Sequence, residues 1–156
     1  MSLDTALLAR LMSSELDTSR QLYSLLQQEM DAVTHYRTAE LDTLNPAKEQ
    51  QVTLLKQHAG ERLQWMKDHE LPLSPACLKH EEIRNAPDIH PLWQQLAAQY
   101  DANRQLSERL SEMVLALRYR AEQKLRILHA QHNDPHLYNA NGKTAGTHPG
   151  FKSIEA

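Results

Sequence analysis

Histidine is the residue type in this chain with the clearest potential for chemistry. The sequence holds nine histidines, and His129, His132, Asp134 and His136 fall close together. On a helix, His129 and His132 at i and i+3 would bring two imidazole rings near one metal ion. No cysteine joins them, however, and Asp134 and His136 come after the predicted end of the helix. A metal site needs a full ligand set as well as proximity. We therefore favour solvated histidines and predict no metal and no other cofactor.

Nucleophilic catalysis has equally little support. Cys77 is the single cysteine and lies three residues before His80. A reactive thiol needs a base and an electropositive setting, so an inert thiol is the favoured interpretation. The sequence also has no phosphate-binding glycine loop and no Glu-x-x-His pair of the kind found in di-iron bundles. We assign no catalytic residue.

Basic residues concentrate at Arg118, Arg120, Lys124 and Arg126. They could mark a partner surface, or they could interact with the negative end of a helix dipole and, for Arg126, with Glu122 four residues earlier. The formal net charge of −3 gives no overall attraction to nucleic acid, and we expect no exposed aromatic residues among the bases. Nucleic acid is not a predicted partner.

The element that carries these residues is a long apolar stripe from Pro91 to His132. Spacings of three and four predict one helix on the order of 60 Å long, which needs another long helix to cover it. Asn103 interrupts the stripe, as polar residues that fix the register of a coiled coil do. The apolar positions are Leu92, Leu96, Tyr100, Leu106, Leu110, Val114, Leu117, Ala121, Leu125 and Leu128.

Two further helices are predicted before this one. Asp4 is a candidate N-cap for a helix from Thr5 to Leu44, weakened by the polar stretch Ser13–Gln21. Asn45-Pro46 predicts a break, because the residue before proline is disfavoured in the helical region. A second helix then runs from Pro46 to Lys67 or His69, antiparallel to the first.

The rest of the chain is predicted to be a proline-rich loop and a tail. A short helix at Ala76–Arg84 could place Leu78 and Ile83 over the end of the bundle. Asn133–Ala156 holds all but one of the glycines and should be flexible. The prediction is an all-α, coiled-coil-like antiparallel bundle of three long helices over residues 1–132, followed by a flexible tail over 133–156.

The long stripe indicates interaction with another helix. Where its partner is polar, at Ser13–Gln21, the third helix would keep apolar residues uncovered, and such surfaces receive amphipathic helices. Homodimerisation through the same stripe is the alternative. The N-terminus lacks the features of a signal peptide, and no apolar run is long enough to span a membrane, so we expect a cytoplasmic protein without membrane insertion.

The chain resembles the FlgN family of flagellar type III export chaperones. The resemblance rests on the segment AELDTLNPAKEQQVTLLKQHAGERLQWM, on the leucines that follow Asn103, and on the tail segment LYNANGKT, which is similar to a Tyr-x-x-x-Gly segment of the family. It implies an all-α chaperone that is not an enzyme. Such chaperones hold the C-terminal helical segments of hook–filament junction proteins, which are hook-associated proteins, and deliver them to the flagellar export gate.

The resemblance also implies site residues. Cargo binding towards the C-terminal part corresponds here to Leu110, Val114, Leu117, Ala121, Leu125 and Leu128, and docking at the export gate corresponds to Tyr138. Two other hypotheses stay open: a homodimeric coiled-coil adaptor without an export role, and, least favoured, a metal-dependent helical enzyme that uses the histidine cluster.

Overall fold

A computed structural model describes residues 2–133 of the chain. Every regular element in this range is helical. The elements are α1 (Thr5–Thr34), α2 (Thr38–Asp68), the 3-10 helix η1 (Pro75–Lys79), α3 (Glu81–Arg84) and α4 (Ile89–Asn133). The predicted all-α fold, with three long helices and a short helical segment before the third, is confirmed. The predicted tail lies outside the described residues, apart from Asn133.

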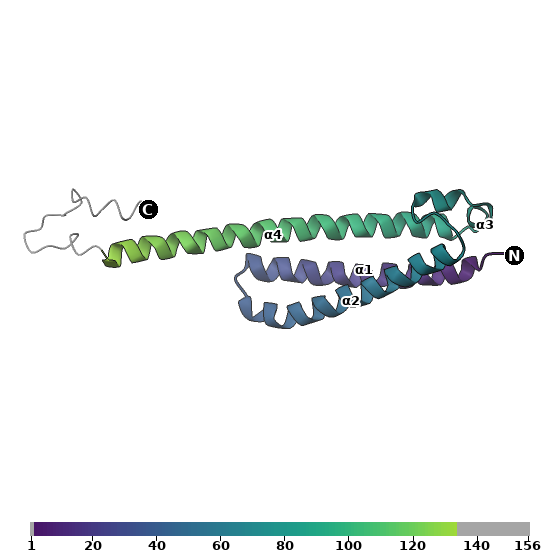
Figure 1. Cartoon of the computed structure of the whole chain (residues 1–156). Helices are drawn as coiled ribbons and strands as arrows, with labels where there is room; N and C mark the ends of the chain where they lie inside the picture. The colour runs from purple at the N-terminus through teal and green to yellow at the C-terminus, as the bar shows by residue number, and fades with distance from the viewer. Residues whose placement is uncertain (1, 134–156) are drawn as a thin grey trace, which may run out of the picture. The chain divides into compact units, whose positions relative to one another are not determined.

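The chain divides into two units, Met1–Ser111 and Glu112–Ala156, and α4 contributes residues to both. In the first unit, α1 and α2 lie side by side as a helical hairpin (Figure 1). The predicted division between residues 132 and 133 concerns residues that are mostly not described, and it stays a prediction.

Helix α1 begins where the sequence predicts and is continuous through its polar stretch. The Asp4 side chain caps the helix by accepting a hydrogen bond from the Leu7 backbone N–H at 3.0 Å. The helix is unbroken through Ser13–Gln21, and Glu15, Thr18 and Ser19 in this stretch are buried. The side chains of Glu15 and Ser19 bond to residues of other helices, whereas the Thr18 hydroxyl donates to the Ser14 carbonyl of α1 itself.

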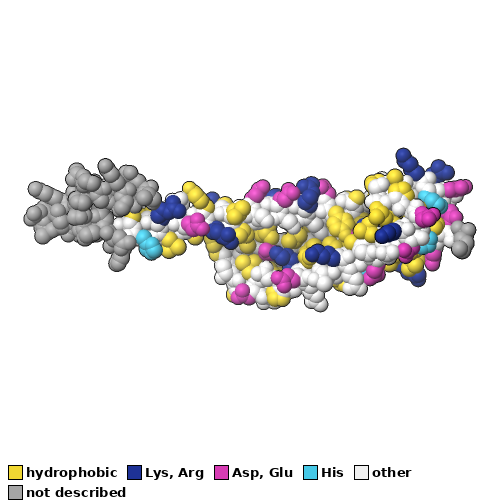
Figure 2. All heavy atoms as spheres, viewed as in Figure 1, with side chains coloured by type: hydrophobic (Ala, Val, Ile, Leu, Met, Phe, Trp, Pro, Cys, Tyr) yellow, Lys and Arg dark blue, Asp and Glu magenta, His cyan; other side chains and the backbone are white. Residues whose placement is uncertain are grey.

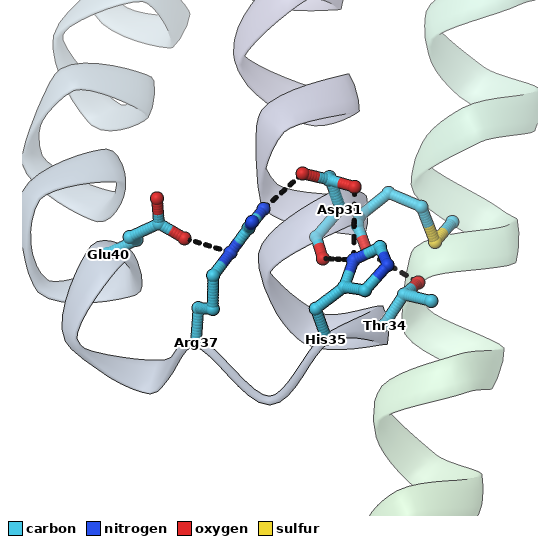
Figure 3. Close-up of polar contacts among 6 residues, drawn as sticks. Asp31, Thr34, His35, Arg37 and Glu40 are labelled. Carbon is cyan, nitrogen blue, oxygen red and sulfur yellow. Dashed lines mark hydrogen bonds and ion pairs between the residues drawn. The ribbon is translucent and has the colours of Figure 1, made fainter.

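The first helix ends ten residues earlier than predicted, at Thr34 rather than Leu44. The chain turns at Tyr36, which has φ of 57°, and the backbone N–H of Arg37 bonds the Ala32 carbonyl at 2.8 Å. The guanidinium of Arg37 bridges the two helices, pairing with Asp31 of α1 and with Glu40 of α2, the latter at 2.5 Å (Figure 3). The turn is therefore closed by charged side chains at its surface.

The predicted break at Asn45-Pro46 was also wrong, since Pro46 lies inside α2. Proline in a helix interior removes the hydrogen bond to the carbonyl four residues earlier, here that of Asp42, at about 3 kcal/mol. Asp42 and Pro46 are both exposed, so water can hydrate that carbonyl. The second helix ends at Asp68, within the predicted limits.

The open end of the hairpin, where α1 begins and α2 ends, holds a compact apolar core. The predicted single short helix is divided into η1 and α3, and Ile83 packs in the core while Leu78 packs against it, as expected. Helix α4 begins at Ile89, two residues before the predicted start, with Pro91 in its first turn, where a missing N–H removes no helical bond. The core residues are Leu8, Met12, Trp65, Met66, Leu71, Cys77, Ile83 and Ile89.

Candidate functional site

A buried carboxylate joins the three long helices of the first unit. Glu15 of α1 is 0% exposed, and its Oε1 lies 2.6 Å from Nε of Arg62 in α2. The hydroxyl of Tyr100 in α4 donates to the other carboxylate oxygen at 2.5 Å. Burial, and then the bond to Glu15, raise the pKa of Tyr100, so its hydroxyl remains a donor at neutral pH. Each helix thus contributes one member of the cluster.

Asn103 adds a second polar connection one turn further along α4. Its side-chain amide donates to both the carbonyl and the hydroxyl oxygen of Ser19, each at 3.0 Å. Its own amide oxygen accepts from Gln99 at 3.0 Å. The hydrogen bonds of this buried amide form only when α4 and α1 are aligned in one way, so Asn103 fixes the register of the two helices. This is the role expected from the sequence.

The six residues assigned to cargo binding do not share one environment. Leu110 belongs to the first unit and is buried, with 5% of its surface exposed. Val114 and Leu117 are half-buried, and Ala121 is exposed. Leu125 and Leu128 are each more than half exposed. The last three residues therefore present the most accessible part of the stripe.

Sequence reasoning missed three other exposed apolar side chains on the same turns. Leu115, Tyr119 and Ile127 are each more than half exposed but fall outside the stripe. Tyr119 stands between Arg118 and Arg120, so the expectation of no exposed aromatic residue among these bases was wrong. These three residues have a helical spacing of their own, first four and then eight residues, and this spacing could have indicated a second apolar row. Figure 2 shows hydrophobic side chains interspersed with lysine and arginine on these turns of α4, next to the residues drawn in grey.

The basic residues of this segment are exposed as well. Arg118, Arg120, Lys124 and Arg126 all have exposed side chains. The expected pairing of Arg126 with Glu122 is not among the ion pairs of residues 2–133. These cations are thus available to a partner.

Among the described residues, the remaining chemical candidates form no catalytic site. The Nδ1 atom of His80 accepts a hydrogen bond from the backbone N–H of Glu82 at 3.2 Å, so this nitrogen caps α3. In the described part of the chain, no group of three or more His, Cys, Asp and Glu side chains could hold a metal ion. Asp134 and His136 of the predicted histidine cluster lie outside that part, as does the side chain of His132.

A surface hollow of about 650 Å³ lies beside the start of α1 and α3, at the open end of the hairpin. Ala6, Ala9 and Pro87 line it, and the Glu82 carboxylate at its edge accepts a hydrogen bond from the Leu3 backbone N–H. That bond ties the N-terminal segment to α3. Its lining residues include neither cysteine nor histidine.

Cys77 should behave as an inert thiol. It is 1% exposed, and burial raises the pKa of its thiol, which lowers the thiolate fraction at neutral pH. We expect a soluble aromatic disulfide reagent to modify the native chain at least about tenfold more slowly than the denatured chain. Absorbance of the released thiolate measures both rates. Rapid, stoichiometric modification of the native chain would contradict this assignment.

None of the helices in residues 2–133 is both long and apolar enough to cross a membrane.

The comparisons with known proteins settle the family. The family model described as FlgN protein matches residues 1–146, which is most of the chain. The chain belongs to the FlgN family. This is the family of flagellar export chaperones for hook-associated proteins, and its members are not enzymes. The matched range includes Tyr138 and ends before Phe151. Tyr138, the residue assigned to gate docking, lies outside the described residues.

A curated member of the FlgN family supports the same assignment. The chain is 31% identical over 114 residues to the flagella synthesis protein FlgN of Escherichia coli strain K12, an alignment that covers 69% of this chain and 82% of that protein. No solved structure matches the chain.

Proposed function

We propose that the chain is a cytosolic export chaperone for hook–filament junction proteins. It binds their C-terminal helical segments, prevents premature assembly and delivers them to the flagellar type III export gate. The observation that carries the proposal is the exposed apolar surface of α4 in a member of a chaperone family, with Leu125 and Leu128 more than half exposed.

The proposed mechanism is the covering of one amphipathic helix by another. A cargo segment that would polymerise through its apolar face instead lays that face on Val114, Leu117, Ala121, Leu125 and Leu128. Affinity comes from the apolar area removed from water, at about 25 cal/mol per Å². The neighbouring arginines and lysine set the orientation by charge, and neither a nucleotide nor another cofactor takes part. Leu110, the sixth residue predicted to bind cargo, is buried in the first unit.

Binding can be tested by mixing the purified full chain with the C-terminal segment of a junction protein. We expect co-elution on size exclusion and a gain in helicity of the segment by circular dichroism. Absence of both would refute the proposal. A tight dimer of the chain at low concentration, with no affinity for the segment, would instead favour the homodimeric adaptor.

The tail should be needed for delivery more than for cargo binding. We expect Tyr138→Ala to reduce export of junction proteins roughly tenfold while changing cargo affinity less than about twofold, because loss of one aromatic anchor commonly costs more than 1 kcal/mol at an interface. Secreted protein in the culture medium and calorimetry measure the two effects.

Phe151→Ala is the matched control, since Phe151 is a tail aromatic beyond the range that the family model matches. It should leave both export and binding unchanged. Equal losses of export and binding in Tyr138→Ala would place the tail in the cargo site.

A further inference from the structure

Helix α4 carries a second apolar face beyond the one assigned to cargo. Leu115, Tyr119 and Ile127 are 60%, 63% and 55% exposed. Spacings of four and eight residues place them in one row along the helix, and Gln123 fills the position between Tyr119 and Ile127. These three residues define what we call the second face.

The second face lies opposite the cargo face. Residues two apart on an α-helix are separated by about 200° around its axis. Leu117 and Tyr119 form one such pair, and Leu125 and Ile127 form another. An amphipathic helix that packs on one side of α4 covers one stripe, so it cannot reach residues on the other side. A single bound helix therefore leaves the second face in water.

The charges beside the two faces indicate what can cover them. Arg118 and Arg126 lie along one border between the faces, and Arg120 and Lys124 lie along the other border. Residues 113–131 contain these four bases and one acid, Glu122, which gives a net charge of +3. A second copy of the segment would be repelled, because both copies carry a net charge of +3. A helix with acidic residues beside its apolar stripe would be attracted.

We propose that the second face binds another amphipathic, acidic helix of the same cargo chain, so that this part of α4 lies between two cargo helices. The inference rests on the proposed function. Packed helices are about 8–10 Å apart, so the axes of the two cargo helices would be about 16–20 Å apart. The linker must pass around α4 rather than through it, a path of about 25–31 Å, so it needs roughly nine residues. Once the first helix binds, the second is held at an effective concentration in the millimolar range.

Site-specific photo-crosslinking on the full chain tests this arrangement. Leu117 on the cargo face and Tyr119 on the second face are replaced, one at a time, by p-benzoylphenylalanine, and the chain is irradiated with a full-length junction protein. We expect both positions to capture cargo, at two different segments that mass spectrometry will show to be amphipathic and acidic. Tyr36, exposed at the turn between α1 and α2, is the control position and should capture none.

The outcomes separate the two proposals. Suppose that position 117 captures cargo. If position 119 then captures nothing, the same cargo segment or a second copy of the chain, the proposal for the second face is overturned and the proposed function stands. Failure of capture at position 117 would overturn the proposed function, and with it the inference.

A second measurement uses the triple variant Leu115→Ala, Tyr119→Ala and Ile127→Ala. We expect its affinity for full-length cargo to fall at least about tenfold, while its affinity for the isolated C-terminal segment stays within about twofold of the original. Alanine keeps the helix propensity high, and circular dichroism checks that helicity is retained. Equal losses for both ligands, or no loss for full-length cargo, would overturn the second face.

Discussion

Replacing Arg62 with alanine should lower the free energy of unfolding by about 3–5 kcal/mol, the typical effect of removing one partner of a buried ion pair. The variant leaves the carboxylate of Glu15, which is 0% exposed, without its cation. Arg62 also stacks over the Trp93 ring, with 5.6 Å from the guanidinium carbon to the ring centroid, and that contact is lost as well. Unfolding in guanidinium chloride, followed by circular dichroism, measures the change.

Arg104→Ala is the matched control. Arg104 also holds two acidic groups, Asp101 at 2.6 Å and Glu108 at 3.0 Å, but all three side chains are more than half exposed. Water and salt screen these charges, so the control should unfold almost as the original chain does. Equal effects of the two substitutions would show that the burial of Glu15 does not determine the stability.

A compensating variant separates lost charge from lost packing. The combination Glu15→Met, Arg62→Met and Tyr100→Phe removes every polar member of the cluster and keeps similar volumes. Apolar replacement of a buried charged cluster is often neutral or stabilising. The triple variant should therefore be more stable than Arg62→Ala despite its two additional substitutions.

This cluster also shows why local patterns misjudged α1. Glu15 and Arg62 are 47 residues apart, and Asn103 and Ser19 are 84 apart. The stretch Ser13–Gln21 seemed a poor partner for a long helix because a periodicity argument counts apolar residues on one element at a time. Polar residues that satisfy each other across three helices cannot be identified in that way.

The position of the hairpin turn depended on weak and competing signals. Asn45-Pro46 suggested a break, yet an exposed proline is tolerated inside α2. The residue that carried the better signal was Arg37, a charged residue within the range predicted for the first helix. Its charge suits a surface turn that it closes by pairing with Asp31 and Glu40. Sequence periodicity predicted the helices themselves because their buried faces are long.

The cargo face was predictable in part. Its spacing follows from the sequence, whereas the burial of Leu110 and the exposure of Leu125 depend on where the packing of the first unit ends. The family resemblance implied only that cargo binds towards the C-terminal part. The opposite row of Leu115, Tyr119 and Ile127 was equally regular, but a stripe search that stops at one face does not examine the other.

The most direct test of the cargo face is the double variant Leu125→Ala and Leu128→Ala. Both side chains are more than half exposed in the free chain, so their remaining apolar area can be buried by cargo. At about 25 cal/mol per Å², the two truncations should remove about 2–3 kcal/mol of binding free energy. That corresponds to a loss of roughly 30–100-fold in affinity for a junction protein's C-terminal segment, measured by calorimetry.

Leu73→Ala provides the control for this variant, because Leu73 is 56% exposed, close to the 57% of Leu125, and lies in the loop between α2 and η1. Its truncation should leave affinity unchanged if binding depends on the α4 surface rather than on exposed leucine in general. The double variant itself should keep its helicity, since alanine favours a helix and neither leucine belongs to the buried core. Unchanged affinity in the double variant, or an equal loss in Leu73→Ala, would remove Leu125 and Leu128 from the cargo site and direct attention to the second face.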